Sequence, residues 1–147
     1  MHIAIGSDHG GYEYRQALIP FLQELGHTVE DYGCVSKQSV DYCDYAVLVG
    51  EAVAQGKADR GILICGTGIG MSIMANKVKG VRCALCGDTV SAMFTRAHND
   101  TNVLAMGQRI IGEEVAKEIA RVWLSTPYEG GRHQRRVDKI TAYEQKQ

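Results

Sequence analysis

The chain has 147 residues, enough for one domain with a hydrophobic core, and its 45% hydrophobic and 22% charged residues exclude disorder. A net charge of −1 excludes the overall basic field that would attract nucleic acid or an acidic membrane surface. The apolar runs are too short to cross a bilayer, and the N-terminus does not resemble a signal peptide. The five scattered cysteines do not suggest a disulfide framework. We therefore expect a cytoplasmic protein without nucleic-acid or membrane partners.

Strand and helix patterns alternate along the chain. Strands are predicted over 2–6, 28–33, 61–65, 81–86 and 102–107. Helices are predicted over 12–26, 42–55, 69–77, 88–97 and 112–125, with a further helical tail from about 131. Alternation of this kind indicates parallel strands joined by right-handed crossovers. We therefore expect a single domain over residues 1–147 with an α/β fold, namely a doubly wound three-layer sandwich around a five-stranded parallel sheet of the Rossmann-like or flavodoxin-like kind.

Polar side chains gather near the strand ends. In such folds, sites collect at the carboxyl ends of the strands. The pattern predicts that one edge of the sheet carries most of the distinctive polar chemistry of the chain, namely Asp8, His9, Cys65, His98, Asn99, Asp100 and Arg109. The remaining histidines, His2, His27 and His133, are interpreted as surface residues.

The segment "ILICGTGIGMSI" joins a continuous apolar strand to a helix through a loop that has almost no side chains. The glycines at 66, 68 and 70 let backbone N–H groups approach a ligand, and the following helix directs its positive end to the same place. The loop therefore favours an anion or an oxyanion formed during a reaction, with tight packing as the alternative interpretation. Its spacing does not fit a dinucleotide-binding fingerprint, and no Walker lysine follows.

The cysteines allow two interpretations. Cys65 precedes the glycine loop, where nearby N–H groups would favour its thiolate, although a small buried core residue fits equally well. "CALC" places Cys83 and Cys86 at the spacing of half a zinc site, but residues three apart on a strand point to opposite faces. We therefore interpret that pair as core residues and expect no metal site.

The tail "EGGRHQRRVDKI" places Arg132 and Arg136 four residues apart, on one face of a helix and in its first turns. The helix dipole disfavours cations there, so an anion should compensate. Either these arginines are solvated and pair with Glu129 or Asp138, or they clamp a phosphate group. The sequence alone leaves both open.

Five segments together resemble type B ribose-5-phosphate isomerase: "GSDHGG", "DY" at 41–42, "ILICGTGIGMSIMANK", "HNDTNVLAMGQR" and "YEGGRHQRRV". The resemblance runs in order along nearly the whole chain. It implies interconversion of D-ribose 5-phosphate and D-ribulose 5-phosphate without a metal or an organic cofactor. It also implies a homodimer or a dimer of dimers in which two subunits share each active site.

The resemblance also implies a role for each matching residue. Cys65 matches the base that moves a proton between the first two sugar carbons. The loop matches the anion hole for the enediolate through Gly66, Gly68, Ile69 and Gly70, and Thr67 and His98 match the groups that open the furanose ring. The remaining matches are sugar-hydroxyl contacts at Asp8, Tyr42 and Asn99, and a phosphate site made of His9, Arg109 and a partner subunit's Arg132 and Arg136.

Two other functions fit parts of the sequence. An isomerase of a hexose 6-phosphate, such as allose or galactose 6-phosphate, would share the Cys-Gly-Thr-Gly loop; the "HND" and "GGRHQRR" segments favour ribose over galactose. A non-enzymatic, flavodoxin-like mononucleotide-binding module would explain the sheet and the loop. It would leave Cys65 and the arginine tail without a role.

Overall fold

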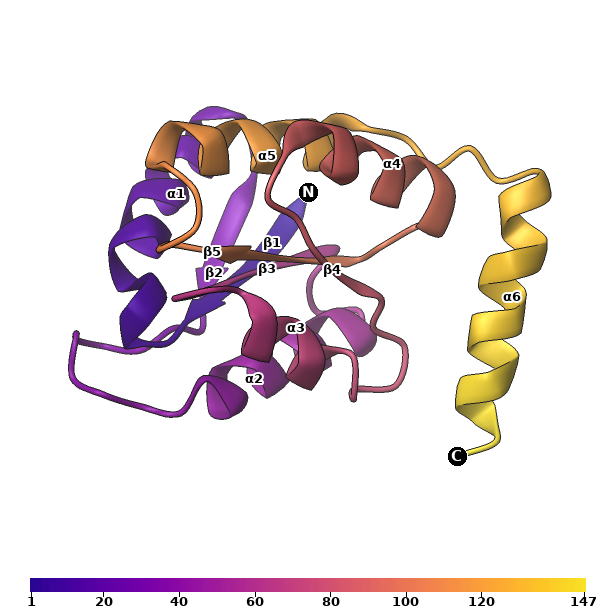
Figure 1. Cartoon of the computed structure of the whole chain (residues 1–147), viewed down its shortest axis with the longest axis horizontal. Helices are drawn as coiled ribbons and strands as arrows, with labels where there is room; N and C mark the ends of the chain where they lie inside the picture. The colour runs from indigo at the N-terminus through magenta and orange to yellow at the C-terminus, as the bar shows by residue number, and fades with distance from the viewer.

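The computed structural model describes residues 1–147, and its centre is a sheet of five parallel strands (Figure 1). The strands lie in the order β2-β1-β3-β5-β4. Their bounds are β1 His2–Ser7, β2 Thr28–Asp31, β3 Arg60–Cys65, β4 Cys83–Leu85 and β5 Val103–Gly107. The expected doubly wound α/β sandwich with five parallel strands is therefore confirmed. The second and fourth strands are shorter than their apolar patterns predict, and both lie at the edges of the sheet.

Helices cover both faces of the sheet. On one face lie α1 (Tyr12–Glu24), α4 (Thr89–Asn99) and α5 (Glu113–Ser125), and on the other lie α2 (Tyr42–Ala54) and α3 (Ile69–Ala75) (Figure 1). Helix α1 continues through Pro20. The chain passes from β1 to β2 on one side of the sheet and then to β3 on the other. This reversal separates the loops after β1 and β3, and such a switch point is where doubly wound folds form ligand-binding crevices.

The interior strands β3 and β5 are buried on both faces, which explains their continuous apolar sequences. Successive side chains alternate between the layers: Ile62 and Ile64 pack in the α1/α4/α5 layer, whereas Leu63 and Cys65 pack in the α2/α3 layer. The register places Cys65 opposite Gly107. The carboxyl ends of β3 and β5 therefore lie side by side.

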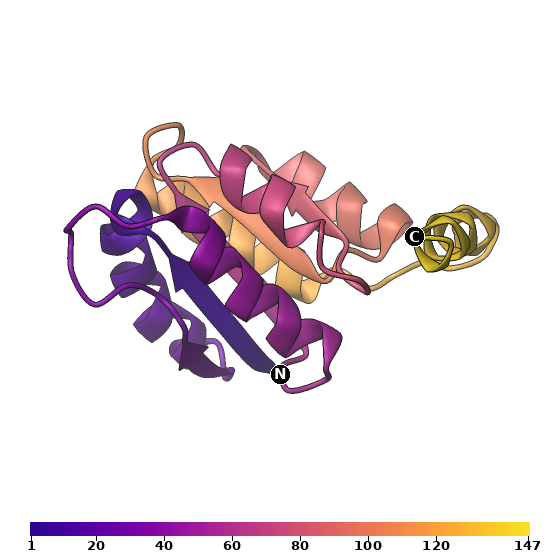
Figure 2. The same cartoon turned by 90° about the horizontal axis from the view of Figure 1, so that it is seen from below.

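Helix α6 (Arg132–Gln145) stands apart from the sandwich, where Figure 1 and Figure 2 both place it beyond the end of α4. The expected tail helix is present, but only the first part of its apolar face is covered: Val137 is buried, whereas Ile140 and Tyr143 are exposed. None of the helices combines the length and the apolar character that a membrane span requires.

Candidate active site

A cavity of about 230 Å³ opens at the switch point of the sheet. Its walls come from the turn after β1, the start of α2, the loop after β3 and the turn after β5. The lining residues are Asp8, His9, Gly10, Tyr42, Cys65, Gly66, Thr67, Gly70 and Arg109. The structure thus brings together most of the residues that the sequence predicts for one site.

The turn after β1 is held by its own polar groups. Asp8 is buried and caps the short helix His9–Gly11, because its Oδ1 accepts a hydrogen bond from the Gly10 N–H at 2.9 Å. The Nδ1 atom of His9 accepts the N–H of Val40 at 3.2 Å. In that contact Nδ1 carries no proton, so Nε2 is the protonated nitrogen of a neutral ring. His9 can therefore donate a hydrogen bond through Nε2 to an anion.

Two glycines of the loop, Gly68 and Gly70, pack so closely against their neighbours that a side chain cannot be added without displacing them. Gly68 begins α3 with a φ of 78°, and a Cβ there would lie 2.6 Å from Leu85 Cδ1. A Cβ on Gly70 would lie 2.6 Å from the Tyr42 ring. The loop is thus bare for tight packing and also for access to the cavity, so the two interpretations of its glycines hold together.

Cys65 is 5% exposed and packs in the α2/α3 core layer, which agrees with the interpretation of this cysteine as a small buried core residue. It also lines the cavity, and its Sγ accepts the N–H of Gly68 at 3.1 Å. A donor directed at sulfur stabilises negative charge there. The structure therefore gives this thiol both a packed position and a backbone N–H directed at its sulfur.

Tyr42 closes the cavity from the start of α2. The adjacent Cys43, as a charge and as a hydrogen-bond partner, raises the pKa of the Tyr42 hydroxyl above its usual value. The hydroxyl therefore stays protonated at neutral pH and can donate to a sugar oxygen.

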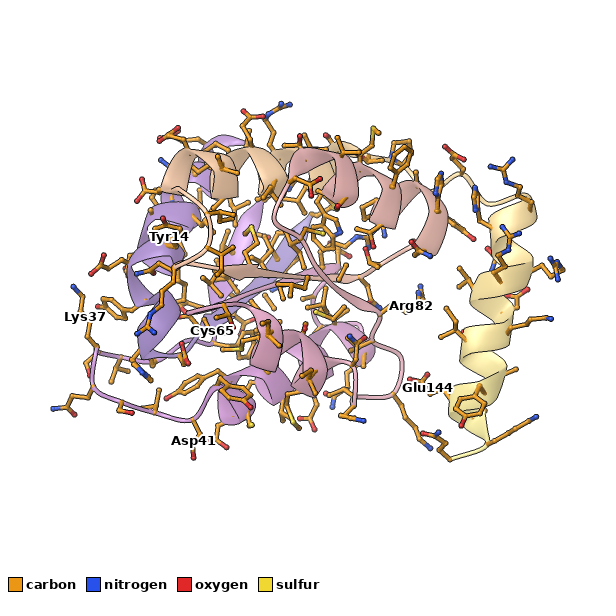
Figure 3. All side chains as sticks on the ribbon, viewed as in Figure 1. Tyr14, Lys37, Asp41, Cys65, Arg82 and Glu144 are labelled. Carbon is orange, nitrogen blue, oxygen red and sulfur yellow. The ribbon has the colours of Figure 1, made fainter.

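His98, Asn99 and Asp100 do not lie at this cavity, and the expectation that they share one end of the sheet with Cys65 is wrong. The first two end α4 and all three precede β5, so they lie at the amino end of the sheet, whereas Cys65 ends β3. The five residues of β5 span about 13 Å between these ends. Arg82 marks the position of Asn99, because its Nε donates a hydrogen bond to the Asn99 carbonyl at 3.1 Å. Figure 3 shows Arg82 well separated from Cys65.

His133 is buried rather than at the surface, which corrects the sequence interpretation. Its ring is 7% exposed and stacks on the His98 ring, with 4.2 Å between centroids and 13° between planes. Glu129 Oε2 lies 3.3 Å from His133 Nε2 and 4.0 Å from His98 Nε2. Glu129 precedes α6, so no helical spacing in the sequence indicates its contact with His133.

These three side chains place possible metal-ligand atoms within 4.8 Å of one another. Two imidazoles hold a common ion only when their in-plane lone pairs converge on it. The stacked rings lie in nearly parallel planes, so lone pairs that lie in those planes do not converge on one point. In this arrangement the cluster does not fit an ion without rotation of a ring.

Arg132 and Arg136 are exposed on the first turns of α6 and form no ion pair. Glu129 faces the two histidines, and Asp138 accepts a hydrogen bond from Gln134 at 2.8 Å. Glu129 and Asp138 therefore do not neutralise Arg132 and Arg136 in this structure. Both guanidinium groups remain available to an anion.

Cys83 and Cys86 lie on opposite faces of the sheet, as expected from their spacing. Cys83 packs against the α2/α3 layer, and Cys86 belongs to the α1/α4/α5 layer. Burial raises the pKa of Cys83 to about 12 and that of Cys86 to about 11. Both thiols are therefore protonated at neutral pH.

The sequence profile described as Ribose/Galactose Isomerase matches residues 3–140 of this chain. The chain belongs to the ribose/galactose isomerase family. The two polar ends of its sheet are therefore parts of an isomerase, and a non-enzymatic mononucleotide-binding module is not supported.

Relatives in this family are similar over almost their whole length. Ribose-5-phosphate isomerase B of Escherichia coli is 51% identical over 98% of this chain and 97% of its own. D-erythrulose-4-phosphate isomerase of Pectobacterium atrosepticum is 45% identical over 98% of this chain and 95% of its own. The structure of ribose-5-phosphate isomerase B of Clostridium thermocellum superimposes with a TM-score of 0.98 at 49% identity, and covers 99% of both chains.

Proposed function

We propose that this protein interconverts D-ribose 5-phosphate and D-ribulose 5-phosphate. The observation that carries the proposal is the placement of the Cys65 thiol in the cavity wall, with the Gly68 N–H directed at its sulfur at 3.1 Å. Aldose–ketose isomerisation needs one base that reaches two adjacent carbons, next to donors that stabilise an oxyanion. High similarity to a ribose-5-phosphate isomerase B supports the choice of sugar.

The proposed reaction begins with opening of the furanose ring, assisted by Thr67 and His98. The Cys65 thiolate then takes the proton from C2 of the aldehyde and returns it to C1, while a proton moves from O2 to O1. The glycine loop, from Gly66 to Gly70 with Gly68 and Ile69 between them, stabilises the intermediate enediolate. No step requires a metal or an organic cofactor.

The same proposal assigns binding roles to the other polar residues. Asp8, Tyr42 and Asn99 contact the sugar hydroxyls. His9 and Arg109 bind the phosphate group together with Arg132 and Arg136. The neutral His9 ring donates through Nε2, whereas the arginines supply the charge and bidentate geometry that phosphate favours.

We further propose that each active site is shared by two subunits of a homodimer or of a dimer of dimers. Four of the proposed site residues lie at the amino end of the sheet and cannot reach Cys65 of their own chain: His98, Asn99, Arg132 and Arg136. A two-fold arrangement would place the amino end of one subunit against the cavity of the other. Helix α6, from about residue 131, would then extend a one-domain subunit toward its partner.

Exposed apolar side chains support such an interface. They lie on α3, after β5, and on and before α4, and they are Ile69, Ile73, Leu85, Val90, Phe94 and Ile110. An exposed group of this kind marks an interaction surface in a protein of this size. A cytoplasmic location is proposed as well, supported by five cysteines that are all free.

Formation of D-ribulose 5-phosphate from D-ribose 5-phosphate, with a chelator present, tests the proposed reaction directly. Cys65→Ala should lower turnover by about a hundredfold or more, the usual scale for removal of a general base. Phosphate binding should remain almost intact, because Cys65 supplies none of the proposed phosphate contacts. The proposal fails if the wild-type protein prefers allose 6-phosphate or erythrose 4-phosphate, or if Cys65→Ala retains wild-type turnover.

A further inference from the structure

His98 is surrounded by more structure than a residue at a helix end normally has. It is the penultimate residue of α4, and one third of its side chain is exposed. The Phe94 ring lies 4.9 Å from it, and the His133 ring lies 4.2 Å from it. An exposed imidazole at the end of a helix would otherwise occupy several rotamers, so these contacts restrict the plane of its ring.

His133 is buried on a helix whose other residues are mostly exposed. Its Nε2 is buried and lacks a hydrogen bond of good geometry, although Glu129 Oε2 lies 3.3 Å away. Burial of a polar ring without full pairing lowers stability, and an apolar side chain could fill the same space. The imidazole at this position therefore calls for an explanation other than packing.

Glu129 is fixed to the same helix end. Its backbone N–H donates to the Ala97 carbonyl at 3.0 Å, so the residue just before His98 holds it in place. Its carboxylate lies within 4.0 Å of both imidazole Nε2 atoms. Glu129, His133 and His98 thus form one compact unit that ties the start of α6 to the end of α4.

We infer that Glu129 and His133 are positioning residues that hold His98 in the orientation needed to open the sugar ring. This inference rests on the proposed function. Stacking on His133 fixes the plane of the His98 ring, and the Glu129 carboxylate stabilises the positive charge that the ring gains when it accepts a hydroxyl proton. Because Arg132 precedes His133, the same contact also sets the direction in which the phosphate-binding arginines leave the body of the subunit.

Loss of ring opening has a kinetic signature that general damage lacks. An enzyme that opens the furanose itself consumes ribose 5-phosphate at a rate that rises with enzyme concentration. An enzyme that uses only the open-chain aldehyde becomes limited by spontaneous ring opening, so its rate reaches a plateau as enzyme concentration increases. We would therefore measure the initial rate of conversion at increasing enzyme concentration, with ribose 5-phosphate kept in large excess over the enzyme.

His133→Ala should lower steady-state turnover on ribose 5-phosphate by about ten- to a hundredfold, the scale of a misplacement of about 1 Å. It should show the plateau, and KM should change little. His133→Phe keeps a flat ring for stacking and should recover to within about threefold of wild type by the same geometric reasoning. Glu129→Gln keeps the shape without the charge and should also show the plateau. Gln134→Ala, next to His133 on the exposed side of α6, is the control and should behave as wild type.

The inference is overturned if His133→Ala keeps wild-type turnover with a rate that still rises in proportion to enzyme. It is also overturned if a folded His133→Phe is no better than His133→Ala, or if Glu129→Gln matches wild type. Should His133→Ala not fold, the other two variants decide the question. Wild-type protein that does not convert ribose 5-phosphate would refute the proposed function instead, so the two failures are distinguishable.

Discussion

Two inactive variants of this chain should restore activity when they assemble together, because the proposed site takes Cys65 from one subunit and His98 from another. We would refold an equal mixture of Cys65→Ala and His98→Asn chains. Each site then receives an intact Cys65 half with a probability of one half and an intact His98 half with the same probability. About a quarter of wild-type activity should therefore return, whether the assembly is a dimer or a dimer of dimers.

The control combines two lesions from the same end of the sheet. Cys65→Ala mixed with Thr67→Ala leaves a lesion in every Cys65 half, so no activity should return. The assay is the initial rate of ribulose 5-phosphate formation, with the fraction of mixed assemblies determined by native mass spectrometry. If mixed assemblies form and the Cys65→Ala with His98→Asn mixture stays inactive, the shared-site arrangement is wrong.

Two further predictions concern packing and titration. Gly107→Ala would place a Cβ 2.5 Å from the Thr67 carbonyl oxygen of the glycine loop, so the free energy of unfolding should fall by about 1–3 kcal/mol and turnover should fall with it. Gly112→Ala is the control, because a Cβ at Gly112 meets open space, and it should leave turnover unchanged. Equal losses in the two variants would contradict this reasoning. Because burial raises the pKa of Cys83 to about 12 and that of Cys86 to about 11, their thiolate fractions at pH 8 are about one in 10⁴ and one in 10³. Peptide mapping should find both unmodified by iodoacetamide until the protein unfolds, and early alkylation of Cys83 would contradict its burial.

Sequence patterns predicted the sheet and the gathering of polar residues around Cys65 for the same reason. In a parallel sheet all carboxyl ends meet at one edge, so residues that follow strands, such as Asp8, Cys65 and Arg109, must come together. The same rule places His98 and Asn99 at the amino ends of the strands, on the opposite side of the sheet from Cys65, because these two residues precede β5. The error came from grouping residues by their nearness to a strand without asking which end of the strand they flank.

The support around His98 could not be predicted with the same certainty. His133 lies four residues before Val137 and so shares a face of α6 with the expected apolar residues, which could have indicated its burial. Which partner covers that face depends on the course of the segment between α5 and α6. No periodic pattern specifies that course, because residues 126–131 form no helix or strand.

Strand β5 connects the two halves of functional chemistry within one chain. Its amino end follows the α4 segment that carries His98 and Asn99, and its carboxyl end leads within two residues to Arg109. In an assembly with shared sites, these two ends would serve different substrate molecules. All five residues of β5 are buried and pair with β3, and the first three, from Val103 to Ala105, also pair with β4. If the sites are shared as proposed, about 13 Å of buried, hydrogen-bonded backbone would join the two sites to which one chain contributes, so a displacement at one end of β5 would be transmitted toward the other.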